Sequence, residues 1–390
     1  AKEVSVSFGS TFESGHLILM ATDLDKVTVL RPLFFDKAKE TKILISTADD
    51  LMNFAKGVNA QDGTENMDVY LEKDIDMSSV GDWIPIGNGT FSGTAVNGAA
   101  FKGTFYGKNH TIKGLKMVVP ADAPAGTTCG LFGVISGATV KDVNIGEGSA
   151  FTSSSAKMTC GGAVAGAVVN STIDHCSSLA SFDISGGADN VGQRFGGVAG
   201  SVYSAGEIAA QVVNCTNFGA FKSVNRTNSK NGGTAFSIGG VVGFAESAST
   251  ALRTMVKSCD NYGAMNVQAS RNAGVVATLN KNATVEDCKN YGEITNTDTK
   301  ATNTRVAGIV SALNIQTSAI NCVNKGNVTF AVAGNTTQGY AAGIVGQTND
   351  ASCVVDGCEN YGMVRSDIFN ATDPLKKFIA IIVANTNNKT

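Results

Sequence analysis

The sequence has few of the residues that mark several common classes of protein. Its 390 residues include 5 prolines, 1 tryptophan and 3 histidines, and charged residues make up only 16% of the chain. So few prolines beside 45 glycines exclude a collagen and a proline-rich linker. The best apolar run, 378–384, is far shorter than the roughly 18 residues of a membrane-spanning helix, so no transmembrane segment is predicted. A net charge of −3 argues against a nucleic acid partner, because binding to a phosphate backbone needs a basic surface.

The N-terminus also lacks the charged start and apolar core of a signal peptide. We therefore expect that any signal peptide has already been removed, and that a lipid anchor could have been attached upstream. A hydrophobic content of 43% is too high for a disordered chain. A chain of this length ordinarily forms two or three domains, unless it is one elongated array of repeats.

Two short patterns alternate along the chain from about residue 130. The first is a glycine followed by small apolar residues, and its copies lie at 130–133, 162–165, 197–200, 240–243, 274–277, 308–311, 343–346 and, in a degenerate form, 380–383. The second is Cys-x-Asn-x-Gly, at 215–219, 259–263, 288–292, 322–326 and 358–362, with a degenerate copy at 176–180. Successive glycine anchors are 32 to 43 residues apart. A constant order of elements with variable connections is typical of a solenoid, in which insertions form loops.

The repeating units are predicted to be strands. Segments after each Cys motif, such as 265–267 and 328–330, alternate with period two and contain β-branched residues beside glycines. No helical period persists through a repeat, which excludes a helical solenoid. The predicted fold is therefore all-β, a right-handed single-stranded parallel β-helix with a short N-terminal capping helix and extra N-terminal strands.

In such a coil, equivalent residues stack about 4.8 Å apart. One predicted column contains the thiols of Cys176, Cys215, Cys259, Cys288, Cys322 and Cys358. A second contains the amides of Asn217, Asn261, Asn290, Asn324 and Asn360, which can bond to one another along the column. We expect the glycine two residues after each asparagine to adopt a positive φ at this corner. Phe218, Tyr262, Tyr291 and Tyr361 should form a partial aromatic stack that Lys325 interrupts.

The N-terminal third contains one predicted helix, at 47–59. Thr47 and Asp50 resemble a capping box, and Leu51, Phe54, Ala55 and Val58 form one apolar stripe. A helix placed here would cover the open end of the solenoid. The predicted organisation is an N-terminal β segment or cap at 1–45, a capping helix at 46–60 and the β-helix at 61–390.

An ordered series of motifs resembles the GLUG-motif family of bacterial surface proteins. The series comprises 74–77 (Asp-Ile-Asp-Met), 82–87 (Asp-Trp-Ile-Pro-Ile-Gly), 101–107 (Phe-Lys-Gly-Thr-Phe-Tyr-Gly), 109–112 (Asn-His-Thr-Ile), 130–133 (Gly-Leu-Phe-Gly), 139–143 (Thr-Val-Lys-Asp-Val) and the Cys-x-Asn-x-Gly units. The resemblance covers roughly residues 43–384. It implies a right-handed parallel β-helix at the cell surface or outside the cell, often adhesin-like. The motif also occurs in non-catalytic regions of bacterial IgA-specific metalloproteases.

Catalytic motifs are not evident in the sequence. None of the three histidines is followed by the glutamate of a zinc protease motif, and no cysteine pair has zinc-site spacing, so no metal or other cofactor is predicted. Carbohydrate-active β-helices collect acids from neighbouring coils, but Glu286 and Asp287 lie between a coil with Lys257 and a coil with Ile320. Asp74 and Asp76 could bind calcium, although outward acids on a strand more often face water. No catalytic residue is therefore assigned, and the chain is predicted not to be an enzyme.

The nine cysteines cannot all pair internally, because their number is odd. Parallel stacking keeps their Cβ atoms slightly too far apart for unstrained disulfides, so most of the column should be buried free thiols.

The leading functional hypothesis is a non-enzymatic, secreted or cell-surface β-helix, adhesin-like and monomeric, that binds a glycan or a host surface protein. Its binding residues would lie in corner loops at 185–194, 225–236, 297–305 and 331–340. Two alternatives stay open: a polysaccharide lyase or glycoside hydrolase on the same fold, and a passive stalk of a larger surface protein, including an IgA-protease-like non-catalytic region.

Overall fold

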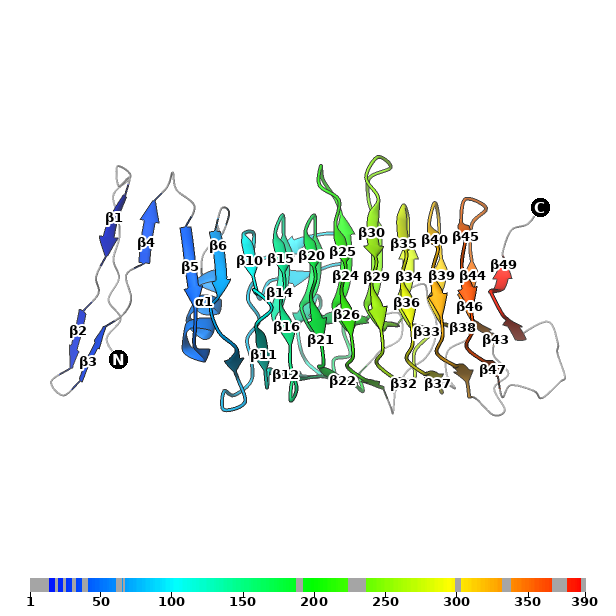
Figure 1. Ribbon diagram of the computed structural model, residues 1–390, viewed down its shortest axis with the longest axis horizontal. Helices are drawn as coiled ribbons and strands as arrows, with labels where there is room; N and C mark the ends of the chain where they lie inside the picture. The colour runs from blue at the N-terminus through cyan, green and yellow to red at the C-terminus, as the bar shows by residue number, and fades with distance from the viewer. Residues whose placement is uncertain are drawn as a thin grey trace.

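The computed structural model shows a right-handed parallel β-helix, which confirms the predicted fold class (Figure 1). It describes residues 41–60, 65, 67–186, 192–223, 236–298, 303–331, 338–366 and 377–386, together with four short strands nearer the N-terminus. Those four pair as two antiparallel ribbons, β1 (Ser14–Leu17) with β4 (Leu33–Asp36) and β2 (Met20–Asp23) with β3 (Lys26–Val29).

Five parallel sheets, here named A to E in the order in which the chain enters them, run along the solenoid. Sheet A contains β5 (Thr41–Ile45), β6 (Met67–Leu71), β10 (Thr104–Tyr106), β15 (Thr139–Lys141), β20 (Thr172–Asp174), β25 (Gln211–Val213), β30 (Thr254–Lys257), β35 (Ala283–Glu286), β40 (Ser318–Ile320) and β45 (Val354–Asp356). Sheet B contains β7 (Ile75–Asp76), β11 (Thr111–Lys113), β16 (Asn144–Ile145), β21 (Ser177–Ser178), β26 (Thr216–Asn217), β31 (Asp260–Asn261), β36 (Lys289–Asn290), β41 (Val323–Asn324) and β46 (Glu359–Asn360).

The remaining three sheets have eight strands each. Sheet C contains β12 (Lys116–Val119), β17 (Ala150–Ser153), β22 (Ser181–Ile184), β27 (Phe221–Lys222), β32 (Met265–Val267), β37 (Ile294–Asn296), β42 (Val328–Phe330) and β47 (Val364–Ser366). Sheet D contains β13 (Thr127–Cys129), β18 (Thr159–Gly162), β23 (Arg194–Gly196), β28 (Ser237–Gly239), β33 (Arg271–Ala273), β38 (Asn303–Ala307), β43 (Gln338–Ala342) and β48 (Lys377–Ala380). Sheet E contains β14 (Phe132–Ser136), β19 (Ala165–Val169), β24 (Ala199–Ser204), β29 (Val242–Ser247), β34 (Val276–Asn280), β39 (Val310–Leu313), β44 (Val345–Thr348) and β49 (Val383–Thr386).

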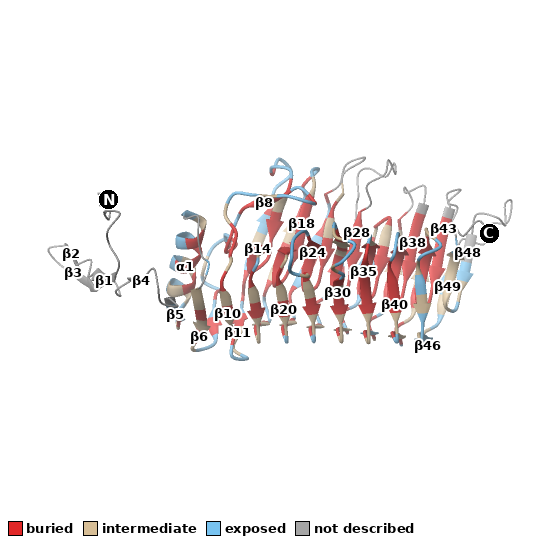
Figure 2. Cartoon of the chain, turned by 90° about the horizontal axis from the view of Figure 1, so that it is seen from above, coloured by how far each residue is buried: buried red, intermediate tan, exposed pale blue. Residues whose placement is uncertain are grey.

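The core consists of rows of like side chains that stack from coil to coil. The inner row of sheet A is buried in all but its two end strands, from Val69 through Phe105, Val140, Ile173, Val212, Val256 and Val285 to Ala319. Figure 2 shows the same continuous buried interior along the solenoid. On sheet C, Phe151, Phe182 and Phe221 stack with ring centroids 5.3 and 4.6 Å apart. Because each coil repeats the apolar pattern of the last, the core has one elongated interior.

The turn from sheet A to sheet B requires left-handed backbone. The residue before each column cysteine has a φ of 51–60°, and these residues are His175, Asn214, Ser258, Asp287, Asn321 and Gly357. Asparagine and aspartate tolerate this conformation better than most residues with a side chain. The local role of this position is therefore to form the turn.

The prediction of a positive φ at the glycine after each asparagine is wrong. None of Gly219, Gly263, Gly292, Gly326 and Gly362 lies in the left-handed region. A Cβ added to any of them would instead stand 1.9–2.1 Å from a carbonyl oxygen of the preceding coil. Glycine is needed because the backbones of neighbouring coils pass too close for a side chain.

The N-terminal end is covered by the helix α1 (Ala48–Ala60), which lies between β5 and β6 (Figure 1). Thr47 and Asp50 exchange side-chain to backbone hydrogen bonds at 3.1 Å, as in a capping box. Leu51, Phe54, Ala55 and Val58 are buried, and the Phe54 ring packs 6.0 Å from that of Phe101. The helix therefore contributes its apolar stripe to the first coils of the core.

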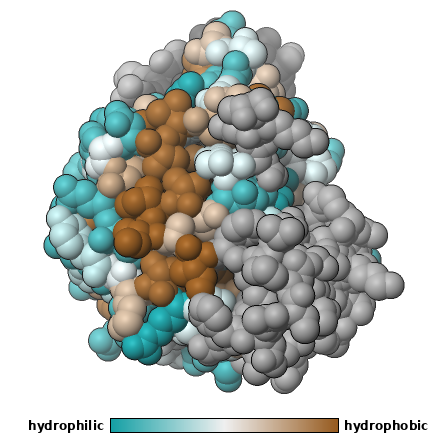
Figure 3. All heavy atoms as spheres, turned by 90° about the vertical axis from the view of Figure 1, so that its right-hand side faces the viewer, coloured by the Kyte–Doolittle hydropathy of each residue, from teal (hydrophilic) through white to brown (hydrophobic). Residues whose placement is uncertain are grey.

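The opposite end shows an apolar surface when viewed along the axis (Figure 3). Met363, Ile379 and Ile381 are exposed there, and Val364 and Val383 of the last strands are partly exposed. Among the described residues, the interior of the solenoid is covered by a helix at one end and reaches the surface at the other.

Candidate functional site

The six column cysteines lie at the start of sheet B, one in each successive coil. The Cys215 backbone N–H donates to Sγ of Cys259 at 3.4 Å, and the Cys259 N–H donates to Sγ of Cys288 at 3.3 Å. All nine cysteines are free thiols. Burial raises the pKa of Cys215, Cys259 and Cys288 well above the ordinary value, so these thiols stay protonated and are poor nucleophiles.

The column asparagines form a continuous chain of amides. Each Nδ2 donates to Oδ1 of the next asparagine at 2.7–2.8 Å, in the order Asn217, Asn261, Asn290, Asn324 and Asn360. Each Nδ2 also donates to the carbonyl of the glycine two residues later at 2.9–3.0 Å. Both amide protons of the first four are therefore used within the protein, which leaves these asparagines without a donor for a ligand.

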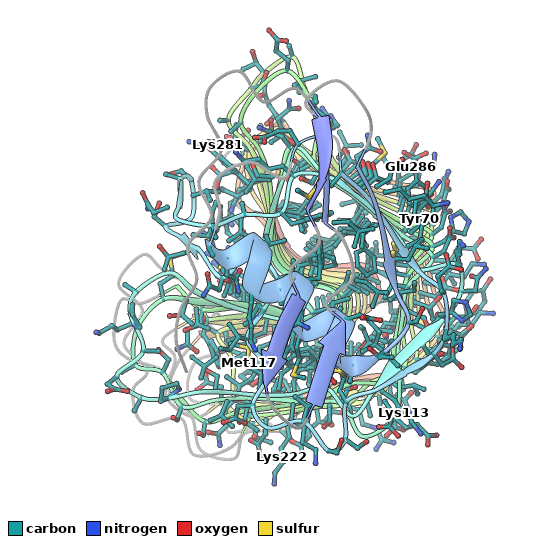
Figure 4. The ribbon with its side chains drawn as sticks, turned by 90° about the vertical axis from the view of Figure 1, so that its left-hand side faces the viewer. Tyr70, Lys113, Met117, Lys222, Lys281 and Glu286 are labelled. Atoms are coloured by element: carbon teal, nitrogen blue, oxygen red, sulfur yellow. The ribbon has the colours of Figure 1, made fainter. Side chains whose placement is uncertain are left out.

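Glu286 and Asp287 form an ion-pair group with Lys257. The Lys257 ammonium lies 2.7 Å from Glu286 and 3.5 Å from Asp287, and the bond from Glu286 raises the pKa of Lys257. Glu286 lies on the outer face of sheet A, on the same side as Tyr70 in the view along the axis (Figure 4). Its strand neighbours in this row are Lys257 and Ile320, so two carboxylates do not face each other across strands here.

Asp74 and Asp76 each have partners in the next coil. Asp74 accepts a hydrogen bond from the Thr111 backbone at 2.9 Å and lies 3.1 Å from His110. Bonds from Ser78, and then Lys113 at 3.0 Å, lower the pKa of Asp76 to about 2. Nowhere in the described part of the chain do three or more His, Cys, Asp or Glu side chains gather as a metal site would require.

A polar hollow of about 340 Å³ opens where sheet E turns into sheet A in the later coils. Its lining is dominated by hydroxyl and amide groups, and none of the described residues that line it carries a carboxylate: Thr250, Arg253, Asn282, Gln316, Thr317, Ser318, Ile320, Ser352 and Val354. Its volume is within the range of small-molecule sites.

Arg253 is the charged group of this polar hollow. It lies between β29 and β30, and its Nη1 donates to the hydroxyls of Thr284 at 2.9 Å and Ser318 at 3.1 Å. Thr284 and Ser318 are register partners on β35 and β40, and their hydroxyls lie 2.8 Å apart. The guanidinium is thus held across two further coils, while its other N–H groups stay available at an exposed position. Such a group can bond to a carboxylate or to sugar hydroxyls.

Sequence reasoning missed this site. Its signal is a row on the outer face of sheet A in which Thr139, Thr172, Gln211, Thr284 and Ser318 occupy equivalent positions, interrupted by Met255 between Gln211 and Thr284. The corner loops predicted to bind a partner, at 185–194, 225–236, 297–305 and 331–340, lie for the most part outside the described residues.

A second amide chain was also missed. Asn349 donates to Asn314 at 2.6 Å, and Asn314 donates to Asn280 at 3.0 Å, along the turn that follows sheet E. Each of these asparagines stands six residues after a glycine anchor, at Gly274, Gly308 and Gly343, so the repeat itself carries the signal that could have found them.

Comparisons with known proteins bear on the fold. A crystal structure of a candidate immunoglobulin A1 protease from Bacteroides ovatus is similar, with a TM-score of 0.51 and 17% sequence identity, covering 88% of this chain and 84% of that chain. A structure named IgA1 Protease matches with a TM-score of 0.49 and 16% identity over 89% of this chain and 23% of that chain. No family model and no curated protein matches the chain. At this identity the first likeness supports the β-helical fold alone. As for the membrane, no described helix combines the length and the apolar character needed to cross one.

Proposed function

We propose that this chain is a non-enzymatic, secreted or cell-surface β-helix that binds a carbohydrate in the polar hollow around Arg253. The observation that carries this proposal is the guanidinium of Arg253, held by the hydroxyls of Thr284 and Ser318 beside a hollow lined with amides and hydroxyls. A saccharide presents many hydroxyls, and fixed donors and acceptors of this kind can orient it without losing side-chain freedom on binding.

Binding is favoured over cleavage by the positions of the acids. Glycoside hydrolysis ordinarily uses two carboxyl groups on either side of the scissile bond. The described residues that line the hollow supply none, and Glu286 and Asp287 are engaged by Lys257. A lyase or hydrolase would need its acids elsewhere on the surface.

A passive stalk is the second candidate. The two amide ladders and the continuous apolar rows support a long rigid spacer, and the likeness to the candidate immunoglobulin A1 protease fits a β-helical, non-catalytic region of a larger surface protein. A stalk requires no ligand at the hollow, which separates the two proposals by experiment.

A glycan array with the purified chain tests the proposal. We expect binding to at least one glycan class, and Arg253→Gln should weaken that binding at least tenfold while the melting temperature is unchanged. Lys257→Gln is the matched control, because Lys257 lies on the same sheet outside the hollow and should leave binding intact. Binding that survives Arg253→Gln would contradict the site, and an array without any ligand would favour the stalk.

A further inference from the structure

Three arginines lie in one row on the outside of the junction between sheets D and E, here called the D–E junction. Arg194 begins β23, Arg271 begins β33, and Arg305 is their register partner on β38. Ser237 occupies the row between Arg194 and Arg271, and Tyr340 follows Arg305. Arg271 and Arg305 are therefore on adjacent strands, about 4.8 Å apart along the row.

The N-terminal part of the D–E junction is apolar and closed. Phe91, Val134, Cys160, Ala167 and Tyr203 form a second buried cluster outside the solenoid core. Phe91 belongs to the hairpin of β8 (Thr90–Phe91) and β9 (Val96–Asn97), which covers this cluster. The turn of the hairpin reaches Arg194, since a Cβ on Gly93 would stand 3.3 Å from its Nη2. The arginine row thus begins where the apolar cover ends.

The hydrogen-bond partners of the three arginines are all neutral. Arg194 donates to the Ser201 hydroxyl at 3.1 Å, and its guanidinium lies 3.7 Å from the centre of the Phe244 ring. Arg305 is 8% exposed, and its Nε donates to Oε1 of Gln347. Neutral partners offset only part of the free energy needed to remove a charge from water.

Arg271 has the poorest set of partners. Its Nη1 makes a long bond of 3.4 Å to the Thr278 hydroxyl, and its Nε is buried without an acceptor. Burial, followed by the charges of Arg305 and Arg194, lowers the pKa of Arg271 to about 9. Burial likewise lowers the pKa of Arg305 to about 10.

In the part of the chain that the structure describes, no carboxylate compensates the charges of Arg271 and Arg305. Among the described residues, Glu246 on β29 is the acid whose charge acts on the row, and it acts on Arg194. Glu246 also lies 3.9 Å from Lys281. In the coil of Arg305, the sheet E position that is in register with Thr278 is occupied by Ala312, which has no polar side-chain atom. Arg271 and Arg305 therefore form a pair of neighbouring cations with an unused donor between sheets D and E.

We propose that Arg271 and Arg305 form a binding site for an oxyanion, such as a carboxylate or sulfate group, at the D–E junction. Two guanidinium groups one strand apart can donate parallel N–H bonds to the oxygens of one such group, which is a geometry that arginine forms readily. The anion would supply the missing acceptor of Arg271 Nε and would relieve the repulsion between the two cations. This site is separate from the polar hollow and does not rest on the carbohydrate proposal.

Calorimetric titration of the full chain with inorganic sulfate, at constant ionic strength set with chloride, tests this site. We expect saturable binding that becomes at least tenfold weaker in Arg271→Gln and in Arg305→Gln. Arg365→Gln is the matched control. Arg365 is exposed on β47 of sheet C, outside both the D–E junction and the polar hollow, so this variant should bind sulfate as the unmodified chain does. If a glutamine variant loses its native circular dichroism, Arg271→Lys keeps the charge without the planar guanidinium and should also bind at least several-fold more weakly.

Two further arms identify the source of the anion. Tighter Arg271-dependent binding of dextran sulfate or of an oligogalacturonate would assign the site to an acidic glycan, whereas Arg271-dependent binding of sulfate alone would assign it to a small anion. No saturable binding, or binding equal in the unmodified chain and Arg271→Gln, would overturn the proposal. Because the carbohydrate proposal depends on Arg253, the two can fail independently.

Discussion

A Cβ added to Gly274 would stand 2.3 Å from Cγ of Asn290. The two sequence motifs, the glycine anchor and Cys-x-Asn-x-Gly, therefore meet inside the same coil. The same contact recurs in the neighbouring coils, in the pairs Gly197–Asn217, Gly240–Asn261, Gly308–Asn324 and Gly343–Asn360. The amide ladder is thus packed directly against a column of glycines, which keeps water away from it.

Gly274→Ala should destabilise the fold severely, by about 4 kcal/mol or more, because backbone and ladder atoms cannot yield to the new methyl group. Gly57→Ala is the control. Gly57 lies in α1 with nothing within 4 Å of the added Cβ, so this change should stabilise the chain by about 0.5–1 kcal/mol. Urea unfolding measures the stability of both variants. If Gly274→Ala were as stable as Gly57→Ala, the close packing of this glycine against the ladder would be contradicted.

Asn290→Ala should lower the free energy of unfolding by about 2–4 kcal/mol. The change removes the bonds to Gly292 and Asn324 and leaves Asn261 without its acceptor, all in a fully buried position. Asn266→Ala, at an exposed position of β32, should change the unfolding free energy by less than about 0.5 kcal/mol. A ladder variant as stable as this control would show that the amide chain adds nothing to stability.

The stability of the chain should fall as the pH rises above about 9. Burial raises the pKa of Cys129 to about 12 and of Cys160 to about 11, from an ordinary value of 9.0. Between pH 9 and these pKa values, the thiols of the unfolded chain release protons that those of the folded chain retain. Each such thiol therefore lowers the stability by about 1.4 kcal/mol per pH unit. Their contribution is complete below pH 9 and is lost toward pH 11–12.

Urea unfolding at pH 7, 9 and 10.5 measures this loss. Cys160→Ala should reduce the slope of stability against pH above 9, because it removes one titrating thiol, although it also lowers the stability at pH 7 by leaving a cavity. A stability that stays constant from pH 9 to 10.5 would contradict the assignment of buried, protonated thiols.

Arg271→Met should raise the stability at pH 7 by roughly 1–3 kcal/mol in the absence of an anion. Burial lowers the pKa of Arg271 to about 9, so the side chain is still charged at pH 7 and the folded state bears the cost of holding that charge away from water. Arg253→Met, at an exposed site, should not produce this gain. Thermal unfolding in chloride buffer distinguishes the two, and a lower melting temperature for Arg271→Met would show that the arginine stabilises the fold.

The repeat and the choice of a parallel β-helix could be predicted from the sequence, since the anchors and period-two segments recur along the chain. The capping residues Thr47 and Asp50 were recognisable because a capping box is a local pattern. The conformation of Gly292 was not predictable in the same way. A glycine needed for a close approach and a glycine needed for a positive φ look alike in a sequence.

The sequence by itself determined that one unit is wound repeatedly, because the spacing of apolar and glycine residues specifies strands that can bury themselves only against their neighbours. Only the tertiary structure decided how far outward residues are removed from water: Arg305 is buried, and Arg194 and Arg271 are half-buried. Arg194, Arg271 and Arg305 each stand three residues before a glycine anchor, where strand alternation alone points the side chain toward solvent. They are withdrawn from water because sheets D and E converge on their outer side, and the angle between two sheets depends on the whole coil rather than on any local pattern.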